Sequence, residues 1–234
     1  MKVGEFEIEI NRKKIKNIHL AVLPPTAKVR ISVPWHYSDK ATREYLESKL
    51  PWIREAVKKI KATVSKNYRE FVSGEIHNLF GKDYTLQIIH SKETPSITIT
   101  SNEVIMKCYP KMDKNERAAF LFNFYKNELT KQLEPLLVKW LNRMKEDGLK
   151  VEYGIDNMPR QWGKCYPMRR KIVFNLFLAR VPLECIEYVV VHELNHLKIH
   201  GHGKDFKSRM DYFLPDWKIR RKSLNDFPSL SLTS

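Results

Sequence analysis

The chain has 234 residues, 42% of them hydrophobic and 29% charged, so it can bury a large core as one domain or two. Lys and Arg exceed Asp and Glu by 15, which favours polyanionic partners such as nucleic acid or nucleotides, although net charge alone identifies none. The three cysteines are too few for a disulfide scaffold. No apolar run is long enough to span a membrane, and the N-terminal residues lack the pattern of a signal peptide, which argues against a membrane or secreted protein. We therefore expect a cytoplasmic protein.

The first 110 residues are rich in predicted strands. Apolar and polar residues alternate over 5–11, 17–23 and 28–33, and Pro24-Pro25 marks a turn. A helix is predicted from Ser38-Asp39, and Pro51 within its pattern predicts either a kink or two helices meeting there. Short alternating runs at 75–80, 84–90, 96–100 and 103–108 predict more strands. Residues 1–70 hold 16 basic and 8 acidic residues, which concentrates the basic excess in this part.

Helices dominate the rest of the predicted structure. Asp113 precedes the longest helical pattern, in which Pro135 predicts a kink or a second helix and Gly148 an end. Strands are expected at 151–153 and 172–175. Later helices are expected at about 182–200, with Pro182 as the first residue and Gly201 after the last, and at 204–214 and 216–224. No internal repeat is evident.

The predicted helix at 182–200 carries a His-Glu-x-x-His motif. His192 and His196 are four residues apart, so both lie on one helix face and can bind one cation through ring nitrogens. Glu193 can then take a proton from the water that the cation holds, which is the chemistry of zinc hydrolases. The apolar residues 188–191 directly before the motif predict that the first half of this helix is buried.

A catalytic zinc site needs a third protein ligand, and the spacing leaves alternatives open. His202, beyond the flexible Gly201, and His200 both follow the helix, and Asp205 or Asp211 would give a two-histidine, one-carboxylate set. Cys165 is expected to be a packed thiol, and His77 and His90 are expected to be structural.

The order of several short motifs resembles one known family. The matching pieces are Trp162-Gly163-x-Cys165, Asn175, the run from Tyr188 through His192-Glu193 and His196 to Leu197, His202-x-x-x-Phe206 and Pro215-Asp216-Trp217, with Ser32-Val33-Pro34, Trp52-Ile53, Ser73-Gly74-Glu75 and 79–84 upstream. Together they look like the YgjP family of metallopeptidase-like proteins, which is related to the SprT and WLM zincins. The sequence departs from the family pattern at Gln161, Lys164 and Gly203.

The resemblance implies an α+β fold. A β-rich N-terminal region with one helix, residues 1–110, would pack on a zincin-like helical domain, residues 111–228. It also implies one Zn²⁺ ion held by His192, His196 and His202, with Glu193 as the catalytic carboxylate. The substrate would be a protein or peptide, and the SprT relatives point to proteins bound to nucleic acid.

Two other functions compete with a zinc metallopeptidase. One is a metal-dependent phosphohydrolase acting on nucleotides, with phosphates held by the basic runs 169–171 and 220–222. The other is a basic nucleic-acid-binding module with a structural zinc. We expect substrate contacts from a tentative set, of which Trp162 and Asn175 also fit a packing role: Trp162, Lys164, Arg169, Arg170 and Asn175.

Overall fold

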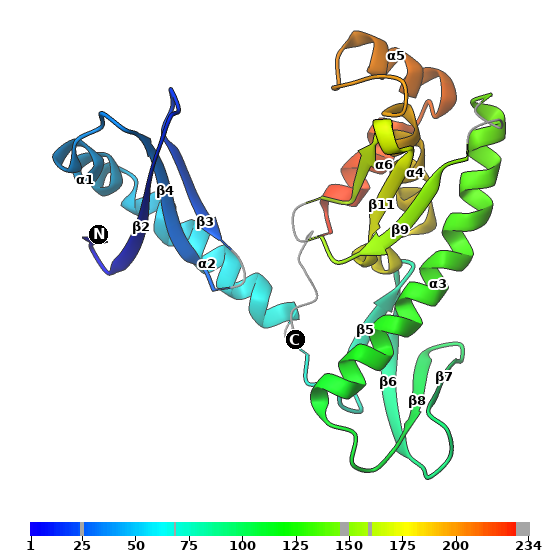
Figure 1. Cartoon of the computed structure of the whole chain (residues 1–234). Helices are drawn as coiled ribbons and strands as arrows, with labels where there is room; N and C mark the ends of the chain where they lie inside the picture. Colours follow the sequence, from blue (N-terminus) through cyan, green and yellow to red (C-terminus); the bar gives the residue numbers. More distant parts are fainter. Residues whose placement is uncertain (24–25, 68, 146–149, 159–160, 228–234) are drawn as a thin grey trace. The chain divides into compact units, whose positions relative to one another are not determined.

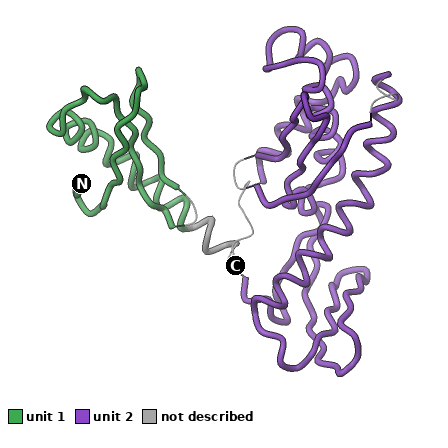
Figure 2. Tube along the Cα trace, in the orientation of Figure 1, with its two compact units in different colours: residues 1–68, 233 green, residues 69–232, 234 purple. Residues whose placement is uncertain are grey.

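The structure is a computed structural model that describes residues 1–23, 26–67, 69–145, 150–158 and 161–227, with side chains omitted for 62–67. It is an α+β protein with two compact units, shown in Figure 2. Unit 1 is Met1–Tyr68, and unit 2 begins at Arg69. The predicted turn at Pro24-Pro25 and the predicted helix end at Gly148 lie outside the described residues. No helix in the described part is long and apolar enough to cross a membrane.

Unit 1 is a four-stranded sheet with two helices. The strands β1 (Lys2–Val3), β2 (Phe6–Lys13), β3 (His19–Leu23) and β4 (Lys28–Pro34) lie in the order β1-β2-β4-β3, with only the β2–β4 pair parallel. Two helices, α1 (Asp39–Ser48) and α2 (Leu50–Asn67), meet near Pro51, as one of the two alternatives for this proline predicted. Alternate residues of β4 and one face of each helix form the core, which includes Ile31, Leu46 and Ile53.

Unit 2 opens with a second sheet of the same topology (Figure 1). The strands β5 (Ile76–Leu79), β6 (Lys82–His90), β7 (Ser96–Ile99) and β8 (Glu103–Cys108) lie in the order β5-β6-β8-β7, again with only the central pair parallel. In both sheets the first hairpin turns at a glycine with positive φ, Gly4 and Gly81. The structure thus contains a repeated strand arrangement that the sequence did not reveal.

Helix α3 (Lys114–Arg143) follows β8 and joins the two halves of unit 2. Asp113 caps it in a capping box with Glu116, which satisfies amide groups at the helix start. The helix runs through Pro135 as a single element, so no second helix begins there. Its buried stripe, including Leu121 and Leu129, shares one core with β6, β8 and the C-terminal helices. For this reason the units divide at residue 68 instead of near 110, and unit 1 contains two helices instead of one.

The C-terminal part of unit 2 carries a three-stranded sheet and three helices. The strands β9 (Glu152–Asp156), β10 (Gly163–Tyr166) and β11 (Lys171–Asn175) lie in the order β10-β11-β9, with short 3-10 helices η1 (Pro167–Arg169) and η2 (Leu176–Arg180) after β10 and β11. Strand β10 was not predicted. The helices are α4 (Leu183–Asn195), α5 (Lys204–Phe213) and α6 (Trp217–Asn225).

Candidate metal centre

Helix α4 carries the His-Glu-x-x-His motif and lies in the core of unit 2. Its residues 188–191 are at most 6% exposed, which confirms the predicted burial of its first half. Pro182 is the N-cap of α4, so the helix begins at Leu183, one residue later than predicted. The helix ends at Asn195, five residues earlier than expected, because the amides of His196 and Leu197 bond to carbonyls three residues back, at 3.1 Å each.

The early helix end and the following turn bring a third histidine to the motif. Gly201 has a φ of 76°, a conformation that glycine adopts without strain, and His202 follows it. The Nε2 atom of His202 lies 3.1 Å from that of His192 and 3.2 Å from that of His196, and the latter two are 3.3 Å apart. Three imidazole nitrogens therefore converge on one point.

These distances fit a tetrahedral zinc ion. Zinc–nitrogen bonds of about 2.0–2.1 Å in tetrahedral geometry place ligand nitrogens about 3.3 Å apart. His196 can donate its Nδ1 proton to the carbonyl oxygen of Ile199, at 3.0 Å, which leaves the lone pair on Nε2. His192 Nδ1 lies 3.4 Å from the hydroxyl of Tyr188, which can hold that ring in the same tautomer.

The surroundings of His192 and His202 favour the neutral imidazole, as metal ligation requires. Burial, followed by the charges of His196, His202 and Arg221, lowers the pKa of His192 to about 3. Burial also lowers the pKa of His202. Phe206, which is 2% exposed, lies beneath the set, with its ring centroid 4.7–4.9 Å from all three imidazoles. The three imidazoles thus pack against one apolar ring.

Glu193 is the buried carboxylate beside this set. It is 6% exposed, and burial raises its pKa to about 7, partly offset by a hydrogen bond from the backbone of Cys165. Strand β10 passes so close that a Cβ atom on Gly163 would lie 2.7 Å from Glu193 Cγ and 2.8 Å from its Oε1. Glycine at position 163 therefore makes room for the carboxylate.

Two adjoining cavities open at this point. The larger, of about 420 Å³, and the smaller, of about 320 Å³, share His192, Glu193 and His202 in their walls. The larger is also lined by aromatic side chains and two cations, which are Trp162, Tyr188, Phe206, Trp217, Lys207 and Arg221. The buried carboxylate and the three histidines are thus reachable from solvent, as a catalytic site requires.

The tentative substrate contacts separate into two groups. Trp162 lines the larger cavity and Lys164 the smaller one. Asn175 is fully buried, donates to the carbonyls of Met158 and Gln161, at 2.6 and 2.9 Å, and lines neither cavity, which fits the packing role better than a substrate contact.

The basic run 169–171 lines neither cavity. Arg169 ends the turn η1 and Arg170 occupies the left-handed region at its end, with a φ of 46°. Neither residue lines either cavity, so these two cavities give no support to their expected role, which stays a prediction. The other basic run divides, because Arg221 lines the larger cavity while Arg220 forms ion pairs with Glu187 and Asp216.

The other candidate ligands lie outside the histidine set. Among the described residues, the only group of three histidine, cysteine or acidic side chains close enough to share a metal ion is His192, His196 and His202. His200 lines the smaller cavity without joining this group. Asp211 accepts a hydrogen bond from Trp217 and pairs with Lys218. Burial and nearby Glu193 raise the pKa of Cys165 to about 11, so it is a thiol at neutral pH.

Sequence reasoning assigned no role to three residues that shape this site. Tyr188 lies four residues before His192, so helical spacing alone would have placed it beneath that ring. Gly163 and Phe206 belong to the motifs quoted above, but their roles depend on contacts between distant segments, Gly163 with Glu193 and Phe206 with the three imidazoles.

Comparison with known proteins agrees with this geometry. No match is found among curated proteins. The family model described as YgjP-like, metallopeptidase domain, matches residues 16–227, which include all of the described part of unit 2, with the motif helix and His202. The chain therefore belongs to the YgjP-like metallopeptidase family, a family of metal-dependent, peptidase-like proteins.

Proposed function

We propose that the protein is a zinc metallopeptidase that hydrolyses peptide bonds with Glu193 as general base. The observation that carries this proposal is the convergence of three imidazole Nε2 atoms, 3.1–3.3 Å apart, beside a buried carboxylate in an open cavity. A zinc ion bound by His192, His196 and His202 would supply Lewis acidity and activate water. An adjacent carboxylate is of no use to a structural zinc, which argues for a catalytic role.

Glu193 would move the protons of the reaction. Its carboxylate takes a proton from the attacking water and then gives it to the leaving amine nitrogen, so the group returns to its starting state. The backbone hydrogen bond from Cys165 and the space left by Gly163 hold this carboxylate in place. The proposed base therefore has a fixed position at the point where the two cavities meet.

Replacement of Glu193 by Gln tests the catalytic role. The variant keeps the shape of the side chain but cannot accept the proton, so we expect unchanged zinc content and loss of hydrolysis by a factor of at least about 100. Zinc is measured by elemental analysis, and activity on casein, on a DNA-bound protein and on nucleoside triphosphates. A wild-type rate on a peptide substrate would refute the role, and Glu193-dependent cleavage of triphosphates alone would favour a phosphohydrolase.

Replacement of His202 tests the ligand set, with His200 as the matched control. His202→Ala removes one of three converging nitrogens, so zinc affinity should fall by at least about tenfold. His200→Ala should retain wild-type affinity, because His200 lies outside the group. Competition with a zinc chelator measures both. Equal affinities in the two variants would contradict the assignment of His202.

A further inference from the structure

The larger cavity contains two cations that the zinc chemistry does not use. Arg221, on α6, and Lys207, on α5, both line it with His192 and His202, and Glu193 is the sole carboxylate among its described lining residues. Within the described part of the chain, neither cation forms an ion pair or hydrogen bond with a carboxylate. Two uncompensated positive charges therefore face the space beside the candidate metal centre.

We propose that Arg221 and Lys207 bind a carboxylate of the substrate, which gives the protein a preference for acidic peptides. The carboxylate is either an acidic side chain near the bond to be cut or the C-terminus of the peptide. This inference rests on the proposed peptidase function and assigns its substrate class. Arginine binds a carboxylate through two parallel hydrogen bonds, and the lysine adds a second positive charge.

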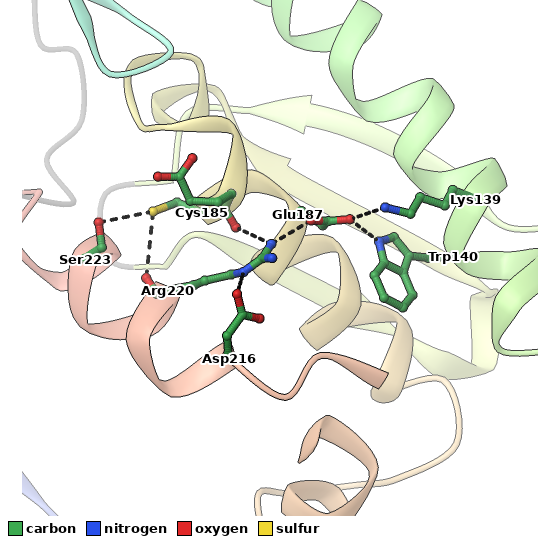
Figure 3. Close-up of polar contacts among 8 residues, drawn as sticks. Lys139, Trp140, Cys185, Glu187, Asp216, Arg220 and Ser223 are labelled. Carbon is green, nitrogen blue, oxygen red and sulfur yellow. Dashed lines mark hydrogen bonds and ion pairs between the residues drawn. The ribbon is translucent and has the colours of Figure 1, made fainter. Parts of the chain in front are cut away.

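Helix α6 is held firmly enough to present Arg221 at a fixed place. The preceding residue, Arg220, donates to Glu187 on α4 at 2.6 Å and to Asp216 at 2.8 Å (Figure 3). Glu187 also accepts hydrogen bonds from Lys139 and Trp140 of α3, at 2.6 and 3.0 Å. Arg220 thus holds α6 against α4, whereas its neighbour Arg221 lines the cavity and can bind a ligand there.

Hydrophobic packing also holds α6 in place. Trp217, at its start, is 5% exposed and stacks on Tyr188 of α4, with ring centroids 6.4 Å apart. Leu224, one turn after Arg220, is 2% exposed. Because residues at both ends of α6 are buried in unit 2, the helix loses little conformational entropy when Arg221 binds an anion.

The lining of the cavity suits a peptide better than a nucleotide. Apolar side chains of Trp162, Phe206 and Trp217 form much of the wall around the two cations. A site for nucleoside triphosphates usually adds several carboxylates or carbonyls for Mg²⁺, whereas the described lining offers Glu193 alone. An acidic peptide would place its aliphatic parts on the aromatic wall and its carboxylate on the cations.

A binding experiment with zinc-loaded Glu193→Gln protein tests the proposal without cleavage. Three acetylated hexapeptides of otherwise identical sequence are titrated by calorimetry: a central Glu with an amidated end, a central Gln with an amidated end, and a central Gln with a free carboxylate. We expect one carboxylate peptide to bind about tenfold more tightly than the amidated Gln peptide. Whichever peptide gains affinity identifies the source of the carboxylate.

Charge-reversal variants locate the preference. Arg221→Glu and Lys207→Glu should each abolish it, and Arg221→Gln should weaken it with less disturbance to folding. Lys222→Glu and Lys204→Glu make the same charge change on the same two helices outside the cavity and should keep it. Unchanged zinc content and circular dichroism verify that each variant is folded.

Four results would overturn the proposal. They are equal affinity for the three peptides, no binding of any at millimolar concentration, a preference that survives both cavity reversals, and binding of a triphosphate but no peptide. Failure of the peptidase function would instead appear as absence of cleavage by the protein with Glu193 intact. The two failures are therefore distinguishable.

Discussion

Glu193 occupies its position because the residue opposite it has no side chain. Gly163 lies on strand β10, far from Glu193 in sequence, and a methyl group there would overlap the carboxylate of Glu193. A carboxylate that acts as general base must stay within reach of the attacking water, and small displacements of catalytic groups are costly. The size of residue 163 therefore controls the geometry of the proposed base.

We expect Gly163→Ala to lower the rate of peptide hydrolysis by about 10- to 100-fold, because the added methyl displaces Glu193. Zinc content should not change, since the three atoms nearest to this methyl group all belong to Glu193 and none to a histidine of the ligand set. Gly154→Ala, in the same sheet, is the matched control, because a Cβ there meets nothing within 4 Å. Equal loss of rate in both variants would show that the effect is not specific to the carboxylate.

His77 couples the stability of unit 2 to pH. It is 5% exposed, with Nδ1 3.2 Å from the Tyr125 hydroxyl and Nε2 3.2 Å from the Glu75 carboxylate. Burial lowers its pKa from 6.5 to about 4, despite the opposing effect of Glu75. Between these values the unfolded chain binds a proton that the folded chain does not, so this contribution to stability is present above pH 6.5 and is lost as pH falls towards 4.

The metal-free protein should therefore lose free energy of unfolding between pH 7.5 and pH 4.5, with a His77 contribution of about 2–3 kcal/mol. In His77→Phe this contribution is absent, and the pH dependence should be shallower by that amount. The exposed His90→Gln provides the control on the next strand. Urea unfolding at both pH values gives the comparison, and identical slopes for wild type and His77→Phe would contradict the assignment.

The motif residues were predictable because their chemistry depends on local spacing. His192 and His196 lie one helical turn apart wherever the helix lies, and Glu193 follows the first of them. The positions of the Arg169 and Arg170 side chains depend on the left-handed backbone at Arg170, which cannot be predicted from the run of basic residues alone. Arg221 was grouped with its basic neighbours, and only the packing of α6 separates it from Arg220.

At the level of elements, α4 is joined to its neighbours by one polar network. The Glu187 side chain, 15% exposed, bonds to α3 through Lys139 and Trp140 and to α6 through Arg220 (Figure 3). Burial raises the pKa of Glu187, but its hydrogen bonds from Lys139 and Arg220 outweigh that effect and leave the pKa lowered. The helix that carries the proposed metal ligands is thus fixed on two sides.

Arg220→Met should lower the free energy of unfolding by about 2–3 kcal/mol, because it leaves the largely buried Glu187 without one of its charged partners. Lys218→Met, on the same helix, breaks an exposed ion pair with Asp211 and should cost at most about 1 kcal/mol. Chemical denaturation of both variants measures the difference. A loss for Arg220→Met no greater than that for Lys218→Met would show that the network contributes little.

Most elements followed from periodicity, and the exceptions have physical causes. The end of α4 was placed too late because 196–200 contain no helix breaker before Gly201, whereas the chain tightens into a turn at His196. Strand β10 has four residues and owes its conformation to pairing with β11, a contact between separate segments. The repeated sheet topology is likewise a matter of which strands pair, and the spacing of apolar residues does not specify pairing.

The molecule as a whole has two hydrophobic cores, one within each unit. Ile31, Leu46 and Ile53 belong to the core of unit 1, whereas Leu86, Leu129 and Val190 belong to that of unit 2. All three proposed zinc ligands lie in unit 2. A ligand that binds only the folded form of one unit stabilises that unit by mass action.

Zinc should therefore raise the melting temperature of unit 2 and leave that of unit 1 unchanged. At a free concentration 100 times the dissociation constant, binding adds about 2.7 kcal/mol to the free energy of unfolding of unit 2. Differential scanning calorimetry with zinc and with a chelator resolves the two transitions, and residues 1–68 measured alone identify that of unit 1. His202→Ala should remove most of the zinc-dependent shift and His200→Ala none of it. A shift shared equally by both transitions would mean that the two cores unfold as one cooperative system.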